Sequence, residues 1–117
     1  MIINQDRIPK GTLSSGEKIP CIGLGTFGSD KYNAEQIAEA VYGAVKYGYR
    51  LIDCASVYQN EDRIGEVLER LMQEKVVARN ELFIVSKVWN DMHDKVHLSC
   101  KKSLRDLRLD YLDLYLI

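Results

Sequence analysis

Three short apolar runs recur along the chain at an interval of about thirty residues. They span residues 49–53, 82–87 and 112–117, and a shorter run at residues 21–24 lies about one interval upstream. An interval of about 30 residues is the length of one strand–helix–strand unit, so the pattern predicts parallel strands joined by helices. The spacing by itself is compatible with a closed barrel and with an open, doubly wound sheet.

Amphipathic helical patterns fill the gaps between these runs. The first helix is predicted to begin after Asn33, which opens a capping-box pattern, and to end before Gly48. The second begins at Asn60, with Glu61 in its first turn, where a negative charge suits the helix dipole. The third is predicted over about residues 93–107. The positions expected to face the sheet are Ile37, Val41, Ala44 and Val45, then Ile64, Val67, Leu68 and Leu71, then Val96, Cys100, Leu104 and Leu107.

The segment before the first strand has a different pattern. Residues 11–20 predict a short hairpin that turns at Ser15 and Gly16. The expected order is therefore a hairpin followed by alternating strands and helices, which is an α/β fold with a parallel sheet.

Composition limits the classes of partner. A net charge of −1 is too small to hold a nucleic acid or an anionic membrane, so we expect neither as a partner. No basic stretch followed by an apolar one occurs in residues 1–6, so no signal peptide is expected, and no apolar run reaches the length of a membrane span. The odd count of 3 cysteines argues against a disulfide framework and favours reduced thiols in the cytoplasm.

Two short motifs match known binding patterns only in part. Gly23, Gly25 and Gly28 fit the dinucleotide-binding glycine pattern, but the helix is predicted to start several residues too late, so we interpret them as a strand end and its loop. His93 and His97 have the spacing of two zinc ligands on a helix, but no third ligand follows, so no metal site is predicted.

A more informative group is formed by Asp53, Tyr58 and Lys87. Asp53 and Lys87 end two neighbouring strands, and Tyr58 lies in the loop after Asp53, so all three are expected at the edge where α/β proteins build active sites. A nearby ammonium group makes a phenol more acidic, and a carboxylate would hold that ammonium in place. The set is compatible with a proton donor and equally with a buried ion pair beside an unrelated tyrosine.

Four segments of the chain, taken in order, resemble the aldo-keto reductase family. The matching segments are residues 19–27 (IPCIGLGTF), 48–55 with 58–61 (GYRLIDCA and YQNE), 86–90 (SKVWN), and 103–107 with 109–117 (SLRDL and LDYLDLYLI). The resemblance implies that residues 1–117 are the amino-terminal half of a single (β/α)8 TIM-barrel domain, with the hairpin plugging the base. It also implies that the barrel is cut after its fourth strand, with no second domain.

The family reduces aldehydes and ketones with NADPH, so the resemblance implies NADPH as cofactor, with NADH as the alternative, and a small carbonyl compound as substrate. By resemblance Tyr58 is the proton donor, Lys87 assists it, and Asp53 pairs with Lys87. Gly25, Thr26 and Asp53 would lie near the nicotinamide ribose. The residues at the substrate mouth would be Phe27, Val57 and Trp89.

The family has a fourth catalytic residue, a histidine that directly follows the strand at residues 112–117. The sequence ends at Ile117, so we expect the 117-residue chain to be nearly inactive by itself. The alternative is a non-catalytic half-barrel or binding subunit that pairs with another chain, because four barrel strands leave two open edges. Full-length family members are often monomers, and the sequence does not define the oligomeric state of this chain or its physiological substrate.

Overall fold

The structure is a computed structural model that describes residues 7–28 and 30–117. It begins with a two-stranded antiparallel hairpin, β1 (Lys10–Thr12) and β2 (Lys18–Pro20). Gly16 at the turn has φ 93°, a conformation that glycine adopts without strain, and this confirms the predicted hairpin and turn. The expectation of no signal peptide concerned residues 1–6, which lie outside the described residues.

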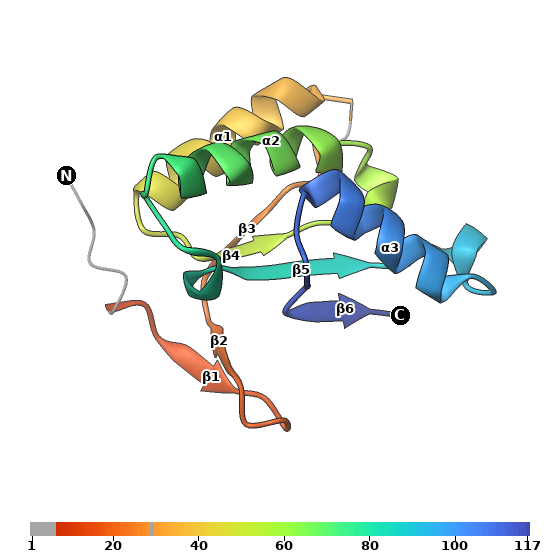
Figure 1. The fold of residues 1–117 in the computed structure, drawn as a ribbon, viewed down its shortest axis with the longest axis horizontal. Helices are drawn as coiled ribbons and strands as arrows, with labels where there is room; N and C mark the ends of the chain where they lie inside the picture. Colours follow the sequence, from red (N-terminus) through yellow and green to blue (C-terminus); the bar gives the residue numbers. More distant parts are fainter. Residues whose placement is uncertain (1–6, 29) are drawn as a thin grey trace.

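A four-stranded parallel sheet forms the centre of the molecule. Its strands are β3 (Gly23–Gly25), β4 (Leu51–Asp53), β5 (Phe83–Lys87) and β6 (Leu114–Leu116), and they lie side by side in chain order. Figure 1 shows the arrows pointing the same way, with the hairpin at the opposite end of the molecule from the strand tips. Because all four strands are parallel, the residues that follow them meet at one edge of the sheet.

Three helices cover one face of the sheet (Figure 1). They are α1 (Ala34–Lys46), α2 (Glu61–Gln73) and α3 (Val96–Leu107). The predicted capping box at Asn33 is present, with both reciprocal hydrogen bonds to Gln36 at 2.8 and 2.9 Å. Gly48 follows α1 with φ 107°, as expected for a glycine that terminates a helix.

The hydrophobic core lies between the sheet and these helices. The apolar stripe predicted for α2 is buried throughout, and α1 contributes Ala38, Val41 and Val45. Helices α2 and α3 approach closely at Gly65. A Cβ at this position would overlap the carbonyl oxygen of Asp106 and lie 2.9 Å from the Cα of Leu107. The absence of a side chain on Gly65 therefore sets how closely these two helices pack.

The third helix differs from its prediction in two respects. It begins at Val96 rather than near residue 93, because residues 93–94 form a turn and Lys95, with φ −136° and ψ 44°, is not helical. Its fully buried face consists of Ser99, Ser103 and Leu107, whereas Val96, Cys100 and Leu104 are only partly buried. The predicted apolar stripe was therefore displaced, because two serines face the interior and form hydrogen bonds there. The two histidines, predicted to lie one turn apart on this helix, are both exposed, and His93 precedes it.

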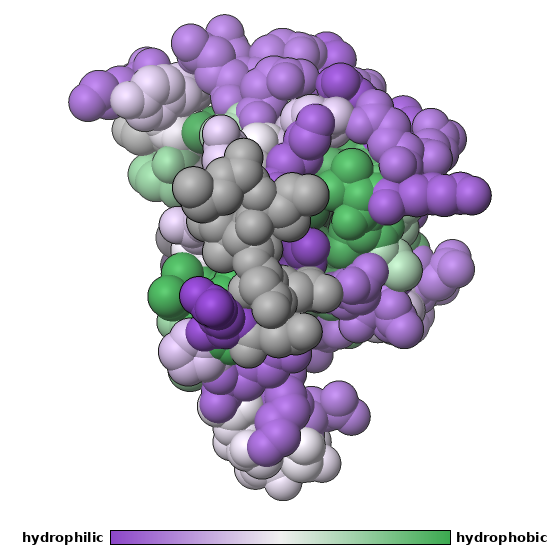
Figure 2. All heavy atoms as spheres, turned by 90° about the vertical axis from the view of Figure 1, so that its left-hand side faces the viewer, coloured by the Kyte–Doolittle hydropathy of each residue, from purple (hydrophilic) through white to green (hydrophobic). Residues whose placement is uncertain are grey.

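A cleft of about 660 Å³ separates the hairpin from the beginnings of the strands. Its lining is mixed, with Lys10, Lys18 and Glu81 beside Leu82 and Phe83. Figure 2 looks onto this end of the molecule, where hydrophilic side chains surround smaller hydrophobic areas. None of the helices in residues 7–28 and 30–117 combines the length and apolar character needed to cross a membrane.

Candidate active site

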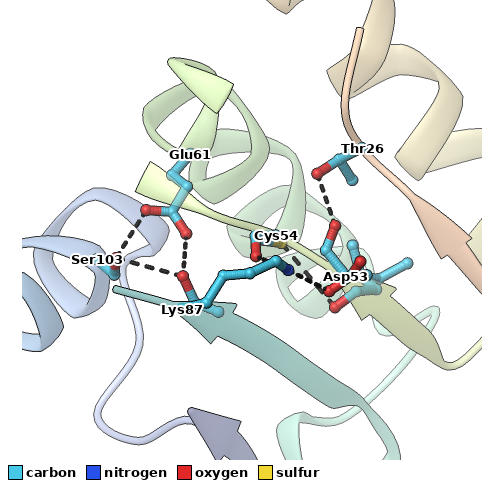
Figure 3. A network of polar contacts seen from close by, with 8 residues as sticks. Thr26, Asp53, Cys54, Glu61, Lys87 and Ser103 are labelled. Carbon is cyan, nitrogen blue, oxygen red and sulfur yellow. Dashed lines mark hydrogen bonds and ion pairs between the residues drawn. The ribbon is translucent and has the colours of Figure 1, made fainter. Parts of the chain in front are cut away.

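Asp53 and Lys87 meet at the carboxyl edge of the sheet, as their positions at the ends of β4 and β5 predict. The Lys87 Nζ lies 2.6 Å from Asp53 Oδ1 and donates a second hydrogen bond, of 2.8 Å, to the carbonyl oxygen of Cys54 (Figure 3). The side chains of Lys87 and Asp53 are 22% and 42% exposed, so the ion pair is held by the fold yet open to a ligand. The ammonium is therefore fixed from two sides.

Tyr58 lies beside this ion pair. It ends a short 3-10 turn, Ser56–Tyr58, that is separated from the end of β4 by two residues, and the next residue, Gln59, has the left-handed φ of 60°. The Lys87 Nζ is 5.3 Å from the centroid of the Tyr58 ring. The structure thus brings together the carboxylate, the phenol and the ammonium that the sequence singled out. The Tyr58 phenol therefore lies beside an ammonium group that is held in place, which is an arrangement that suits a proton donor.

The three residues predicted to line a substrate mouth follow the ends of three successive strands. Phe27 comes after β3, Val57 lies in the turn after β4, and Trp89 comes after β5. They are 67%, 39% and 49% exposed, respectively. The Phe27 ring packs against Tyr58 with centroids 5.2 Å apart at a tilt of 54°. An exposed aromatic surface therefore adjoins the phenol, and such a surface suits an apolar or aromatic ligand.

Gly25 and Thr26, the predicted cofactor contacts, have different environments. A Cβ on Gly25 would meet no heavy atom within 4 Å, so the space over this residue is open. Thr26 is fully buried, and its hydroxyl donates a 2.7 Å hydrogen bond to the carbonyl oxygen of Asp53. The Thr26 side chain therefore fixes the end of β4, whereas Gly25 and the Asp53 carboxylate remain accessible.

Cys54 follows Asp53 and is completely buried. Burial raises the pKa of its thiol, and the nearby carboxylates of Glu61 and Asp53 raise it further. A thiol in this state is a poor nucleophile at neutral pH, so Cys54 is a packing residue of the hydrophobic core.

The structure adds a polar cluster that the sequence did not predict. Glu61, the first residue of α2, is 3% exposed and accepts hydrogen bonds from Ser86 of β5 at 2.7 Å and Ser103 of α3 at 2.8 Å (Figure 3). Burial raises the pKa of Glu61, and the two serine hydrogen bonds act in the opposite direction. The prediction of a negative charge in the first helical turn was right about position, but this carboxylate faces the interior.

Asn60 also differs from its expected local role. It begins α2 as predicted, but its side chain makes no capping hydrogen bond. The Asn60 Nδ2 instead donates a 2.8 Å hydrogen bond to the carbonyl oxygen of Thr26. The sequence contained one sign of the buried cluster of Glu61, Ser86 and Ser103, because Ser86 interrupts an otherwise apolar strand.

Comparison with known proteins places this geometry in a family. The family model described as the aldo/keto reductase family matches residues 21–117. The chain belongs to the aldo/keto reductase family. The resemblance carried by the four sequence motifs is therefore confirmed.

Two curated relatives and one solved structure illustrate the match. Aldo-keto reductase family 1 member A1-A of Danio rerio is 50% identical over 109 residues, which cover 91% of this chain and 33% of that protein. NADH-dependent D-xylose reductase of Candida parapsilosis is 45% identical over 111 residues, covering 93% and 33%. The crystal structure of a Bombyx mori aldo-keto reductase in complex with NADP is 40% identical, with a TM-score of 0.89, and the match covers 94% of this chain and 38% of that one.

The chain therefore spans about a third of the length of the curated relatives it matches. The structural match to an aldo-keto reductase confirms that the four βα strands form part of a family barrel. It also decides between the two folds that strand spacing left open, in favour of the barrel.

Proposed function

We propose that this chain carries the proton-donating side of a carbonyl-reduction site in an NADPH-dependent aldo-keto reductase. The observation that carries the proposal is the close grouping of Asp53, Tyr58 and Lys87 at the carboxyl edge of the sheet. In this proposal, residues 1–117 are the amino-terminal part of one barrel domain, and the substrate is a small aldehyde or ketone. The cytoplasm is the proposed compartment, supported by three free cysteines.

Each of the three residues has one role in the proposed reaction. The Tyr58 hydroxyl donates its proton to the substrate's carbonyl oxygen, which takes up negative charge as the carbonyl is reduced. The Lys87 ammonium stabilises the phenolate that remains, because an adjacent positive charge favours the ionised phenol. The Asp53 carboxylate holds the ammonium in place through its 2.6 Å contact. Phe27, Val57 and Trp89 would surround the reacting carbonyl with apolar surface.

The accessible groups at this edge fit the ribose and ring of a nicotinamide cofactor. The open space over Gly25 admits a flat ring close to the backbone, and the exposed part of the Asp53 carboxylate can accept a hydrogen bond from a ribose hydroxyl. Thr26 would contribute by holding the end of β4 through its buried hydrogen bond. NADPH, when bound, supplies the hydride for the carbonyl carbon, and NADH remains an alternative because relatives named for each cofactor match this chain.

The proposal can be tested by grafting. Residues 21–117 of this chain would replace the matching segment of the Danio rerio relative, and oxidation of NADPH would be followed by absorbance with an aromatic aldehyde as substrate. We expect the grafted protein to be active and the Tyr58→Phe variant to lose about 10²-fold or more in kcat, the usual contribution of a general acid. The matched control is Tyr47→Phe, which alters an exposed tyrosine at the end of α1 and should leave kcat unchanged.

Two results would contradict this function. Full activity in Tyr58→Phe would exclude this phenol as the proton donor. An inactive grafted protein that still folds would show that the grouped residues do not support reduction.

A second candidate is a half-barrel that pairs with another chain. Among the described residues, β3 and β6 each pair with only one strand, so each leaves one edge of the sheet open. Leu116 at the β6 edge is 43% exposed. Sedimentation of the 117-residue chain tests this candidate, because a folded monomer at all accessible concentrations would count against self-pairing.

A further inference from the structure

Glu61 connects the two segments that carry Tyr58 and Lys87. It lies three residues after Tyr58, and its Oε2 accepts a hydrogen bond from the hydroxyl of Ser86, the residue before Lys87. Successive residues of a strand point to opposite faces, so Ser86 reaches Glu61 on the helix side while Lys87 reaches Asp53 on the other. The Glu61 carboxylate therefore lies on the helix side of the sheet, and Figure 3 shows it apart from the contact between Lys87 and Asp53.

Asn60 provides the matching link on the other side of the same loop. Its side chain holds the carbonyl oxygen of Thr26, which lies just beyond β3. Two adjacent residues thus tie the loop after β4 to both neighbouring strand ends, Asn60 to the end of β3 and Glu61 to the end of β5. The Tyr58 turn is consequently fixed at its carboxyl end.

A buried carboxylate such as that of Glu61 is an unusual choice for a residue that only fills space in a core. A buried carboxylate loses its hydration, and apolar side chains of similar volume often serve a core equally well or better. Glu61 is 3% exposed, and its two short hydrogen bonds come from neutral hydroxyls rather than from a cation. A carboxylate offers two acceptor oxygens in fixed geometry, so it can join three elements at one point.

We infer that Glu61 is a positioning residue, which sets the separation of Tyr58 and Lys87 through its hydrogen bond to Ser86. The importance of this role for catalysis rests on the proposed function, but the separation of Tyr58 and Lys87 can be measured without catalysis. The bond to Ser103 has a different role, because it joins α2 to α3, and Ser103 contacts the strand of Lys87 only by accepting a longer, 3.4 Å hydrogen bond from Ser86.

The test uses the isotope-labelled 117-residue chain and the NMR cross peak between the Tyr58 ring protons and the Lys87 ε-methylene protons. We expect the cross peak in the wild type, because the Lys87 Nζ is 5.3 Å from the ring centroid. Glu61→Leu should lose it, whereas Glu61→Gln should keep it, because an amide retains hydrogen bonds to both serines. Protected core amides would verify that each variant is folded.

A matched pair of serine variants makes the test independent of how Glu61→Leu folds. Ser86→Ala and Ser103→Ala each remove one buried hydroxyl and one hydrogen bond to the same carboxylate, and both remove the 3.4 Å hydrogen bond between the two serines, so they differ only in which serine loses its bond to Glu61. The inference predicts loss of the cross peak in Ser86→Ala and its retention in Ser103→Ala. Equal intensities in these two variants, or a retained cross peak in folded Glu61→Leu, would overturn it.

The grafted reductase supplies a second readout. Glu61→Leu should lower kcat about tenfold with KM nearly unchanged, because misplacing a reacting group affects the chemical step more than substrate binding. Asp62→Leu alters an exposed neighbour in the same helical turn and should leave both constants unchanged. An inactive wild-type graft would contradict the proposed function alone, since the NMR result decides the positioning role separately.

Discussion

Substitution of Gly65 by alanine should destabilise the chain although alanine is the better helix former. The new Cβ would overlap the Asp106 carbonyl oxygen and lie 2.9 Å from the Leu107 Cα. Ordinary carbon contacts are about 3.5–4.0 Å, so α2 and α3 would have to separate by roughly an ångström. Overpacking of this kind costs up to about 3 kcal/mol, while the gain in helix propensity is about 1 kcal/mol. Because the overlap with a backbone oxygen places this site at the upper end of that range, the expected net loss is about 2 kcal/mol.

Gly43 in α1 provides the matched control. It is also a helical glycine, but a Cβ there would meet no heavy atom within 4 Å. Gly43→Ala should therefore raise the free energy of unfolding by as much as about 1 kcal/mol. Urea unfolding followed by circular dichroism measures both changes, and the melting temperature of Gly65→Ala should fall by about 10 °C. Two variants that shift stability in the same direction would refute the explanation by close packing.

Two further predictions concern buried groups. A thiol reagent should label exposed Cys21 rapidly, whereas Cys54 should react only in the unfolded chain, because it is fully buried and burial raises the pKa of its thiol. Peptide mapping identifies the labelled cysteine. Rapid labelling of Cys54 in the folded chain would contradict this prediction. Burial also raises the pKa of Glu61, so at this position the folded state binds a proton more tightly than the unfolded state. Relative to Glu61→Gln, which does not titrate here, the wild type should be most stable below the ordinary carboxyl pKa. This advantage in the free energy of unfolding should disappear as the pH rises through the raised pKa of Glu61. Urea titrations of both proteins over this pH range measure it, and a constant difference between their free energies of unfolding would disprove the effect.

Most of the fold follows from local chemistry that the sequence states directly. The apolar runs predicted the parallel strands, and Gly16 and Gly48 predicted a turn and a helix end, because each needs the positive φ that glycine tolerates. Asp53 and Lys87 could be predicted to meet, since parallel strands bring their carboxyl ends to one edge. The start of α3 was predicted too early, because residues 93–94 form a turn and the backbone of Lys95 is not helical, which the apolar periodicity of the helix does not reveal.

The polar interior was harder to predict because its partners come from distant segments. Ser99 and Ser103 look like exposed positions in a helical pattern, yet Ser99 accepts a hydrogen bond from Tyr115 at 2.9 Å and Ser103 donates one to Glu61. Glu61 satisfies the local preference for acids in a first helical turn, so nothing nearby indicates burial. Its burial depends on the docking of α3, a tertiary event that sequence periodicity does not encode.

The order of the strands has a consequence for how the chain folds. After β3, each strand of the parallel sheet pairs with the strand before it in sequence, so its first partner has already been made. During synthesis, β4 can pair with β3 as soon as α1 has emerged, and β5 and β6 can add in turn. The outer edge of β3 stays open during this growth, whereas at the other edge each new βα unit covers the strand added before it. Assembly from the amino terminus is therefore built into the connectivity.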